Sequence, residues 1–185
     1  EDQSLSGADD KTLQAIRGAK IGIIFQEPMS ALNPVMTIGD QVAEPLRHHL
    51  GLSRKAARIE AQAVLERVGL PAAEFPLSRY PHELSGGQRQ RVAIAIAIAL
   101  KPALLIADEA TTALDVTTQA QVLDLLKRLV REDGMGLILI THDLGIIAEM
   151  ADYVVVMYAG RIIERGTVQE IFENPLHPYT IGLQK

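Results

Sequence analysis

The sequence of 185 residues contains no cysteine and no tryptophan, and only 4% of its residues are aromatic. Without cysteine, the chain has neither a disulfide framework nor a thiolate metal site. Its apolar runs are as short as strands and are interrupted by polar residues, whereas a membrane-spanning helix needs about 20 consecutive apolar residues. We therefore expect any association with a membrane to come through a partner.

The composition is that of a folded protein. Hydrophobic residues make up 48% of the chain and charged residues 22%, which is typical of a globular α/β protein and excludes a disordered one. The formal net charge is −5, so the chain has no general electrostatic attraction to nucleic acid. A chain of this length can form one domain with a substantial core.

The most informative stretch is LSGGQRQRVAIAIAIALKPALLIADEATTALD, which covers residues 84–115. It begins with the turn Ser85-Gly86-Gly87, which is expected to open an apolar helix that ends near Leu100. Glycines at a helix start let backbone N–H groups approach an anion closely, and the helix dipole favours negative charge there. Serine and glycine are also common in ordinary capped helix starts, so the turn alone leaves both interpretations open.

The second half of this stretch predicts a buried strand, residues 104–107, that ends in the carboxylates Asp108 and Glu109. A strand without polar residues belongs inside a parallel sheet, and ligands of open α/β sheets lie beyond the carboxyl ends of the strands. Two carboxylates at that place can hold a hydrated Mg²⁺ and orient or deprotonate a water. The alternative is that they only cap the helix that follows.

Another buried strand is predicted from Ile21 to Phe25, after a short helix over residues 12–17. Gln26 stands at its exit and is followed by a loop over residues 27–34. A single glutamine after a strand usually has no special function, so the residues alone give Gln26 no role.

Two amphipathic helices are predicted between Thr37 and Val68. In the first, apolar residues recur every four positions through Leu50, and Pro45 predicts a kink or a short break. Ser53 is expected to cap the second helix. The core stripe expected for this second helix is Ala56, Ile59, Ala63, Val64 and Val68, with Arg54, Lys55, Arg58 and Glu60 facing solvent.

After the two carboxylates, a long helix is predicted from a cap at Thr117 or Thr118 to about Glu132. A wholly apolar strand over residues 137–140 follows. A strand–helix–strand unit of this kind is a right-handed crossover that places both strands in one parallel sheet. His142 comes directly after the second strand; an isolated histidine there is usually structural, but a neutral imidazole at this edge can link phosphate, water and a carboxylate.

LSGGQRQR followed by LLIADEATTALD resembles the signature motif, the Walker B strand and the D-loop of the ATP-binding-cassette (ABC) ATPases, and the resemblance extends along essentially the whole chain. It implies an α/β fold: a partial P-loop NTPase (RecA-like) core with a parallel sheet and an inserted helical subdomain. The implied division is a core piece with the Q-loop at 1–33, the helical subdomain at 34–100, and a core piece with Walker B, D-loop and H-loop at 101–185.

The resemblance implies a role for each candidate residue, with ATP and Mg²⁺ as cofactors. In this family two ATPase domains enclose two ATP molecules head to tail, and the signature residues of one domain cover the γ-phosphate bound by the other. The implied signature residues are Ser85, Gly86, Gly87 and Gln88, with Asp115 in the D-loop. The implied residues of the chain's own site are Asp108 for Mg²⁺, Glu109 as general base, Gln26 for Mg²⁺ and the attacking water, and His142 for the γ-phosphate.

Two further stretches narrow the resemblance. IFQEPMSALNP with TIGDQVAEPL, and ENPLHPYT, resemble ATPase subunits of bacterial importers for di- and oligopeptides, with nickel importers close by. The implied partners are a second, distinct ATPase subunit, transmembrane permease subunits and, indirectly, a substrate-binding protein, but no nucleic acid. The implied location is the cytoplasmic face of the bacterial inner membrane. Ala110 departs from the family pattern, which usually has proline after the glutamate.

No Gly-x-x-x-x-Gly-Lys-Ser/Thr pattern occurs in the sequence, although the family binds its phosphates with such a P-loop N-terminal to the Q-loop. We therefore expect a fragment that hydrolyses ATP negligibly by itself. A soluble ABC ATPase of non-transport function is an alternative, but it would be expected to carry a coiled-coil or basic insertion between Gln26 and Ser85. A non-catalytic interaction module is favoured by the missing P-loop and disfavoured by the intact Asp108, Glu109 and His142.

Overall fold

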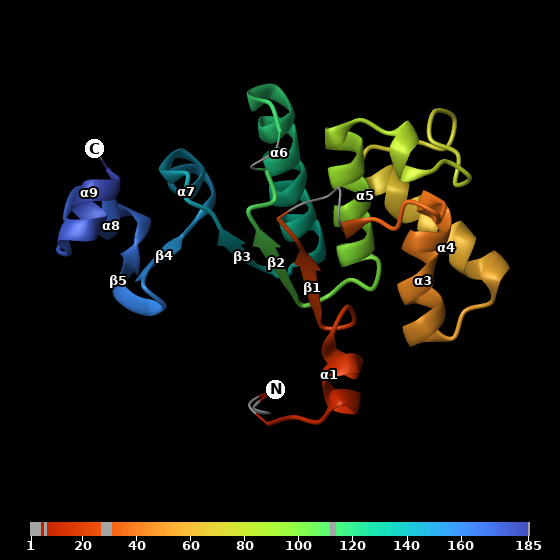
Figure 1. Ribbon diagram of the computed structural model, residues 1–185, viewed down its shortest axis with the longest axis horizontal. Coiled ribbons are helices and arrows are strands. Elements are labelled where there is room, and N and C mark those ends of the chain that lie inside the picture. The colour runs from red at the N-terminus through yellow and green to blue at the C-terminus, as the bar shows by residue number, and fades with distance from the viewer. Residues whose placement is uncertain (1–4, 6, 27–30, 112–113, 185) are drawn as a thin grey trace. The chain divides into compact units, whose positions relative to one another are not determined.

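A three-stranded sheet positions the candidate residues (Figure 1). The computed structural model describes residues 5, 7–26, 31–111 and 114–184, and within them the sheet has the order β1 (Ile21–Ile24), β2 (Leu104–Asp108), β3 (Gly136–Ile140). β1 and β2 are parallel, and Ile24 lies beside Ala107. Both strands therefore end at the same edge of the sheet. The crossover unit was predicted to place the strands before and after the long helix in one sheet. This is confirmed, since β2 and β3 are neighbours in the sheet.

The chain divides into two compact units, residues 1–138 and 139–185. In the first unit, α1 (Asp10–Ile16) precedes β1 and is capped by Asp9, so this helix begins two residues earlier than predicted. β1 ends at Ile24, one residue short of the prediction. No helix in the described part of the chain has the length and apolar character needed to cross a membrane.

Helix α5 (Gly86–Ile98) packs closely against the sheet. Its residues from Val92 to Ala95 are buried, and a Cβ placed on Gly22 of β1 would lie 2.3 Å from the carbonyl oxygen of Ala97. Only glycine allows the helix backbone to come this near to the strand. The expected apolar helix after the Ser-Gly-Gly turn is confirmed, and the close approach explains why Gly22 interrupts an otherwise apolar strand.

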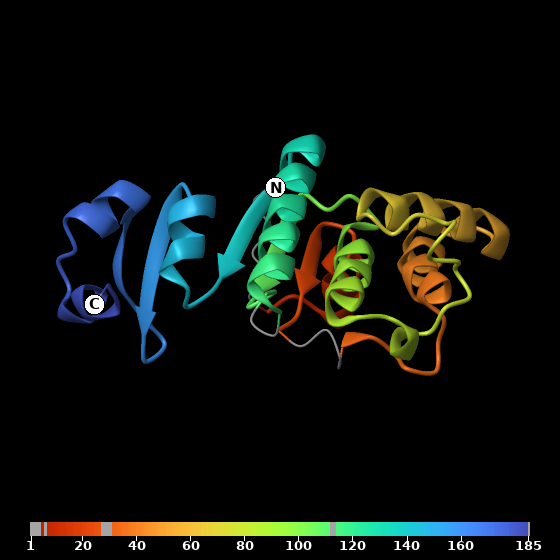
Figure 2. The ribbon, with the colours of Figure 1, turned by 90° about the horizontal axis from the view of Figure 1, so that it is seen from above.

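Helices α3 (Ile38–Leu50) and α4 (Arg54–Arg67) lie beside α5 on one side of β1 (Figures 1 and 2). Thr37 and Ser53 cap them through their side chains, as predicted for Ser53. Of the kink or short break expected at Pro45, the break is absent, since α3 is a single helix through that position, and the kink stays a prediction. The short helix η1 (Pro81–Glu83) then leads to the signature turn.

The core stripe predicted for α4 is confirmed at Val64 and Val68, which are buried, and is wrong at Ile59 and Ala63. Ile59 is 62% exposed and Ala63 is exposed, whereas Ala57, Ala61 and Leu65 are fully buried. Two alanines one turn apart present almost no side-chain bulk, so this face of α4 can pack tightly where α3 and α4 meet. The buried face of α4 therefore depends on how closely α3 and α4 can pack, as well as on hydrophobicity.

Helix α6 (Val116–Asp133) follows the carboxylates, and its predicted cap is also corrected. Asp115 is the N-cap: its carboxylate accepts a hydrogen bond from the N–H of Thr118, and Thr117 and Thr118 lie inside the first turn. Aspartate is as good a cap as threonine or better, and it comes first along the chain. Thr112 and Ala113, which belong to the predicted D-loop, lie outside the described residues, as does the part of the Q-loop at 27–30.

The second unit is built on an antiparallel hairpin of β4 (Tyr153–Tyr158) and β5 (Arg161–Thr167). Its tight turn contains Ala159 and Gly160, both at positive φ. α7 (Leu144–Met150) precedes the hairpin, and α8 (Val168–Glu173) and α9 (Pro178–Leu183) follow it. Thr167 caps α8, with Glu170 completing a reciprocal pair of hydrogen bonds.

Candidate functional site

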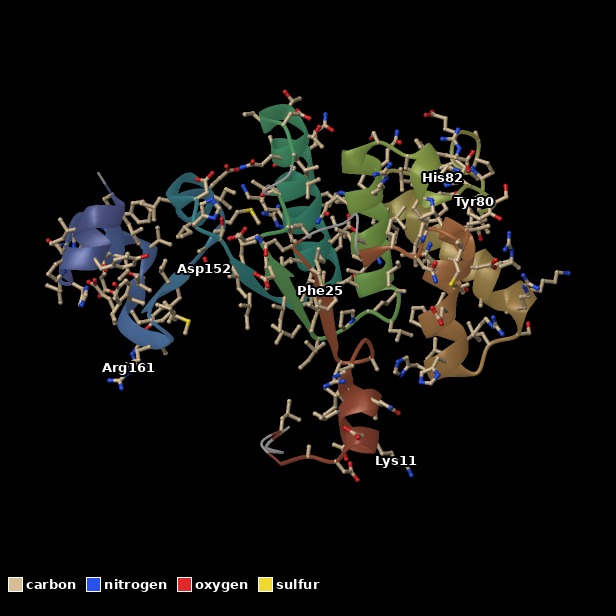
Figure 3. The ribbon with its side chains drawn as sticks, in the orientation of Figure 1. Lys11, Phe25, Tyr80, His82, Asp152 and Arg161 are labelled. Atoms are coloured by element: carbon tan, nitrogen blue, oxygen red, sulfur yellow. The ribbon has the colours of Figure 1, made fainter. Side chains whose placement is uncertain are left out.

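The carboxyl ends of β1 and β2 bring together two of the predicted catalytic residues. Nε2 of Gln26 donates a hydrogen bond to Oε2 of Glu109 over 2.7 Å, although 83 positions separate them in the sequence. The parallel register of the two strands produces this contact, because each strand delivers its following residue to the same edge. Phe25, directly before Gln26, is 60% exposed at this edge (Figure 3).

Glu109 has a backbone conformation that glutamate rarely adopts. Its φ is 45°, in the left-handed region, where an L-residue with a Cβ is disfavoured by about 1–2 kcal/mol. Ala110 and Thr111, which follow it, are buried and fix the chain at this point. A disfavoured backbone that the surroundings enforce is common at functional sites, and the residue held in it here is the one that accepts the hydrogen bond from Gln26.

The donor atoms at this edge suit Mg²⁺. Asp108 is half-buried at the end of β2, and Gln26 and Glu109 add an amide and a carboxylate. Among the described residues there is no cluster of three or more His, Cys, Asp or Glu that could enclose a metal ion. Mg²⁺ usually keeps several waters and binds through one or two carboxylates together with substrate phosphates, so the sparse oxygen set fits this ion.

The signature turn is a capped helix start and is also accessible. The Ser85 N–H donates to Oε1 of Gln88 over 2.8 Å, and the Gln88 N–H donates to Oγ of Ser85 over 3.3 Å. Ser85 and Gly86 are exposed, while Gly87 and Gln88 are half-buried. The turn therefore has both properties that its sequence allowed: a reciprocal cap for α5, and a surface that another molecule can approach.

The start of α6 lies against this turn. A Cβ on Gly87 would be 2.5 Å from the methyl Cγ2 of Thr118, and one on Gly86 would be 3.8 Å from Cδ2 of Leu114. Thr118 also donates its hydroxyl to Oδ2 of Asp115 over 2.6 Å. This hydroxyl, followed by the Thr118 N–H, lowers the pKa of the Asp115 carboxyl below its ordinary value. Sequence reasoning placed Thr118 near the helix start but did not anticipate its contact with the signature turn.

His142 lies in the second unit, after β3, and is exposed. The next residue, Asp143, caps α7 by accepting hydrogen bonds from the N–H groups of Gly145 and Ile146. The described geometry therefore joins Gln26 to Glu109 and the signature turn to Asp115. The expected contact of His142 with the γ-phosphate stays a prediction.

Comparisons with known proteins agree with this arrangement. The family model described as "ABC transporter" matches residues 3–112. A protein of Brucella melitensis, whose name assigns it to peptide import ATP-binding proteins, is 59% identical over 179 residues, which are 97% of this chain and 53% of that protein. The glutathione import ATP-binding protein GsiA of Escherichia coli is 55% identical over 97% of this chain and 29% of its own length.

A similar solved structure is the dimeric, post-hydrolysis state of the ATP-binding cassette MJ0796 bound to ADP and Pi. It has a TM-score of 0.78 and 32% identity, and the match covers 91% of this chain and 71% of that one. The chain spans about half the length, or less, of the curated relatives named above. With a family model that matches more than half of its residues and a fold shared with a solved cassette, the chain belongs to the ABC transporter family.

Proposed function

We propose that this chain is part of the ATP-hydrolysing subunit of a bacterial importer, with di- or oligopeptides as its substrate class. The observation that carries the proposal is the hydrogen bond between Gln26 and Glu109 at the common edge of β1 and β2. The substrate class rests on the relatives, whose names refer to peptide and glutathione import.

Glu109 is the proposed general base. Its carboxylate takes a proton from a water as the water oxygen attacks the γ-phosphate of ATP, and the bond to the ADP oxygen breaks. Gln26 holds that carboxylate through its amide, and its position beside Glu109 lets it orient the same water. Asp108 and Gln26 are the proposed holders of Mg²⁺, which would supply charge stabilisation at the phosphates. His142 is proposed to contact the γ-phosphate.

Ser85, Gly86, Gly87 and Gln88 are proposed to cover a γ-phosphate bound by a second ATPase subunit. The support is the exposure of Ser85 and Gly86 at the N-terminus of α5, where N–H groups and the helix dipole favour an anion. Asp115 is proposed to face the same dimer interface. The phosphates themselves require a P-loop, and since these 185 residues contain no such pattern, we propose that the chain alone hydrolyses ATP negligibly.

The remaining parts of the proposal concern assembly. The second ATPase subunit is proposed to be a distinct chain, and the helical part formed by α3 and α4 to dock on transmembrane permease subunits that receive substrate from a binding protein. This assembly would hold the chain at the cytoplasmic face of the inner membrane as a peripheral protein. Closure of the dimer on ATP and its opening after hydrolysis would then drive transport.

The test is Glu109→Gln in a form of the protein that includes a P-loop. Removing a positioned general base costs a factor of about 10²–10⁴ in rate, so we expect steady-state phosphate release to fall by that factor while ATP binding is retained. ATP binding is measured by titration with a fluorescent ATP analogue, and hydrolysis by phosphate release.

The matched control is Glu60→Gln, the same change on the exposed face of α4, which should leave both quantities unaltered. If Glu109→Gln released phosphate at the unsubstituted rate, the assignment of Glu109 as the base would be wrong.

A further inference from the structure

One side chain, Thr118, connects the signature turn to the start of α6 by two different groups. Its methyl lies 2.5 Å from where a Cβ on Gly87 would be, and its hydroxyl donates to the Asp115 carboxylate over 2.6 Å. Thr118 lies in the first turn of α6 and is half-buried. A single residue thus touches the turn proposed to cover the partner's phosphate and the aspartate proposed for the dimer interface.

The hydroxyl contact fixes the direction of the methyl. Threonine is branched at Cβ and has few favourable χ1 rotamers in a helix, so its methyl and hydroxyl move together. Turning the methyl away from Gly87 would pull the hydroxyl off Asp115, which also accepts the Thr118 N–H over 3.0 Å. The space beside Gly87 is therefore closed by a group that cannot yield without loosening the cap of α6.

We propose that Thr118 is a positioning residue that holds the signature turn and the Asp115 cap in one fixed arrangement, and that Gly87 must be glycine because a Cβ there would lie only 2.5 Å from the Thr118 methyl. This inference rests on the proposed function for its importance to ATP-driven dimer closure.

A rival explanation exists for the glycine. A Gly-Gly turn also lets backbone N–H groups approach a phosphate, and a side chain at position 87 would then be harmful only in the ATP-bound dimer. The two explanations separate in a double-mutant cycle between Gly87→Ala and Thr118→Ser. Serine keeps the hydroxyl for Asp115 and removes only the methyl.

The first measurement is thermal unfolding without nucleotide. Forcing an extra methyl into a closed contact destabilises the fold, and for a chain of this size the expected fall in Tm is about 5 °C. We expect Gly87→Ala to show that fall in the Thr118 background and less than half of it in the Thr118→Ser background. An equal fall in both backgrounds would overturn the proposal.

The second measurement is ATP-driven dimerisation, followed by sedimentation in the Glu109→Gln background of a form that includes a P-loop, so that hydrolysis does not reopen the dimer. Gly87→Ala should weaken the dimer about 10-fold or more, and Thr118→Ser should recover a large part of that loss. Thr118→Val keeps the methyl position and removes the hydroxyl, and it should not recover the loss.

The two measurements also separate this inference from the proposed function. If the protein with Gly87 and Thr118 intact did not dimerise with ATP, the proposed function would fail, while the unfolding cycle would still report the Gly87–Thr118 contact. If dimerisation occurred but Gly87→Ala weakened it equally with Thr118 and with Ser at position 118, the glycine would serve the phosphate and Thr118 would not be a positioning residue.

Discussion

At the scale of single residues, the side chain of Glu164 holds two segments of the second unit together. Its carboxylate on β5 accepts hydrogen bonds from the N–H groups of Leu176 and His177 and from the hydroxyl of Thr180. These contacts hold the LHPYT segment, at the start of α9, to the hairpin. The Thr180 hydroxyl first, and then the Leu176 N–H, lower the pKa of Glu164 below its ordinary value of 4.5.

The Glu164 contacts should therefore depend on pH. Because the pKa is lowered in the folded chain, the stabilising effect is fully present above the ordinary value and is lost as the pH falls through the folded value. We expect the amide protection factors of Leu176 and His177 to be high at pH 7 and to fall on acidification below about pH 4. Hydrogen exchange measured by NMR over this range tests the expectation.

Glu164→Gln is the control for that titration. A glutamine cannot ionise, so protection of the two amides should be lower than in the unsubstituted chain at pH 7 and should not change with pH. A pH dependence that survived this substitution would assign the titration to another group.

At the scale of elements, the C-terminus of α4 is capped by arginines from other helices. Nη2 of Arg128 on α6 donates to the carbonyl of Arg67 over 2.8 Å, and Nη1 of Arg91 on α5 donates to the carbonyl of Val68 over the same distance. Arg67 itself pairs with Asp133 at 2.9 Å, near the end of α6. Charged side chains of α4, α5 and α6 therefore meet at this junction. The two arginines donate hydrogen bonds to carbonyls at the end of α4 that have no partner within the helix.

Arg67→Ala should destabilise this junction. The Asp133 side chain is only 13% exposed, and its Oδ2 is buried without a hydrogen bond from any residue that the structure describes, so loss of Arg67 leaves a largely buried carboxylate without that ion pair. We expect the free energy of unfolding to fall by about 1–3 kcal/mol in urea denaturation.

Arg54→Ala is the matched control for the junction. Arg54 is 72% exposed and lies 3.7 Å from Asp40, a pair that should contribute less than about 0.5 kcal/mol. Equal losses for the two substitutions would show that the burial of Asp133 has no energetic consequence.

The existence and type of the main elements could be predicted from the sequence, but their details could not. Apolar runs predicted β1 and β2, and the pairing of those strands was enough to bring Gln26 to Glu109. The buried face of α4 depended on how near α3 approaches, which periodicity does not contain. The contact of Thr118 with the signature turn was overlooked because its partner, Gly87, is 31 positions away and has no side chain to suggest a contact.

At the scale of the whole molecule, the apolar run at residues 137–140 predicts burial, yet Ile138 is 48% exposed and Ile140 is 47% exposed. Ile23 on β1 is also 40% exposed. A sequence shows that a strand is apolar but not which of its faces is covered. The sequence predicted that β2 and β3 share one sheet, whereas the covering of the sheet's faces depends on packing among distant segments.

The prediction at this scale concerns formation of the ATP-driven dimer. Ser85→Arg places a long cation in the exposed turn proposed to close over a partner's ATP, and we expect it to abolish the ATP-driven dimer of the Glu109→Gln form that includes a P-loop. The lost cap should lower the free energy of unfolding by about 1 kcal/mol. Crosslinking in the presence of ATP measures the amount of dimer, and chemical denaturation measures the free energy of unfolding lost with the cap.

Ser53→Arg separates the two effects. Ser53 caps α4 through the same kind of hydrogen bond, accepted by its Oγ from the N–H of Ala56 over 3.2 Å. The control should therefore lose a similar stability and keep the dimer. An ATP-bound dimer that persisted with arginine at position 85 would refute the role of the signature turn.

The close approach at Gly22 has a mechanical consequence. With the Cβ position of Gly22 only 2.3 Å from the Ala97 carbonyl, the strand leading to Gln26 and the helix beginning at Gly86 touch backbone to backbone. No flexible side chain stands between them to absorb a displacement, and close-packed interiors transmit strain. A tilt of α5 would therefore pivot about this point, with its smallest excursion at Ala97 and its largest at the glycine turn.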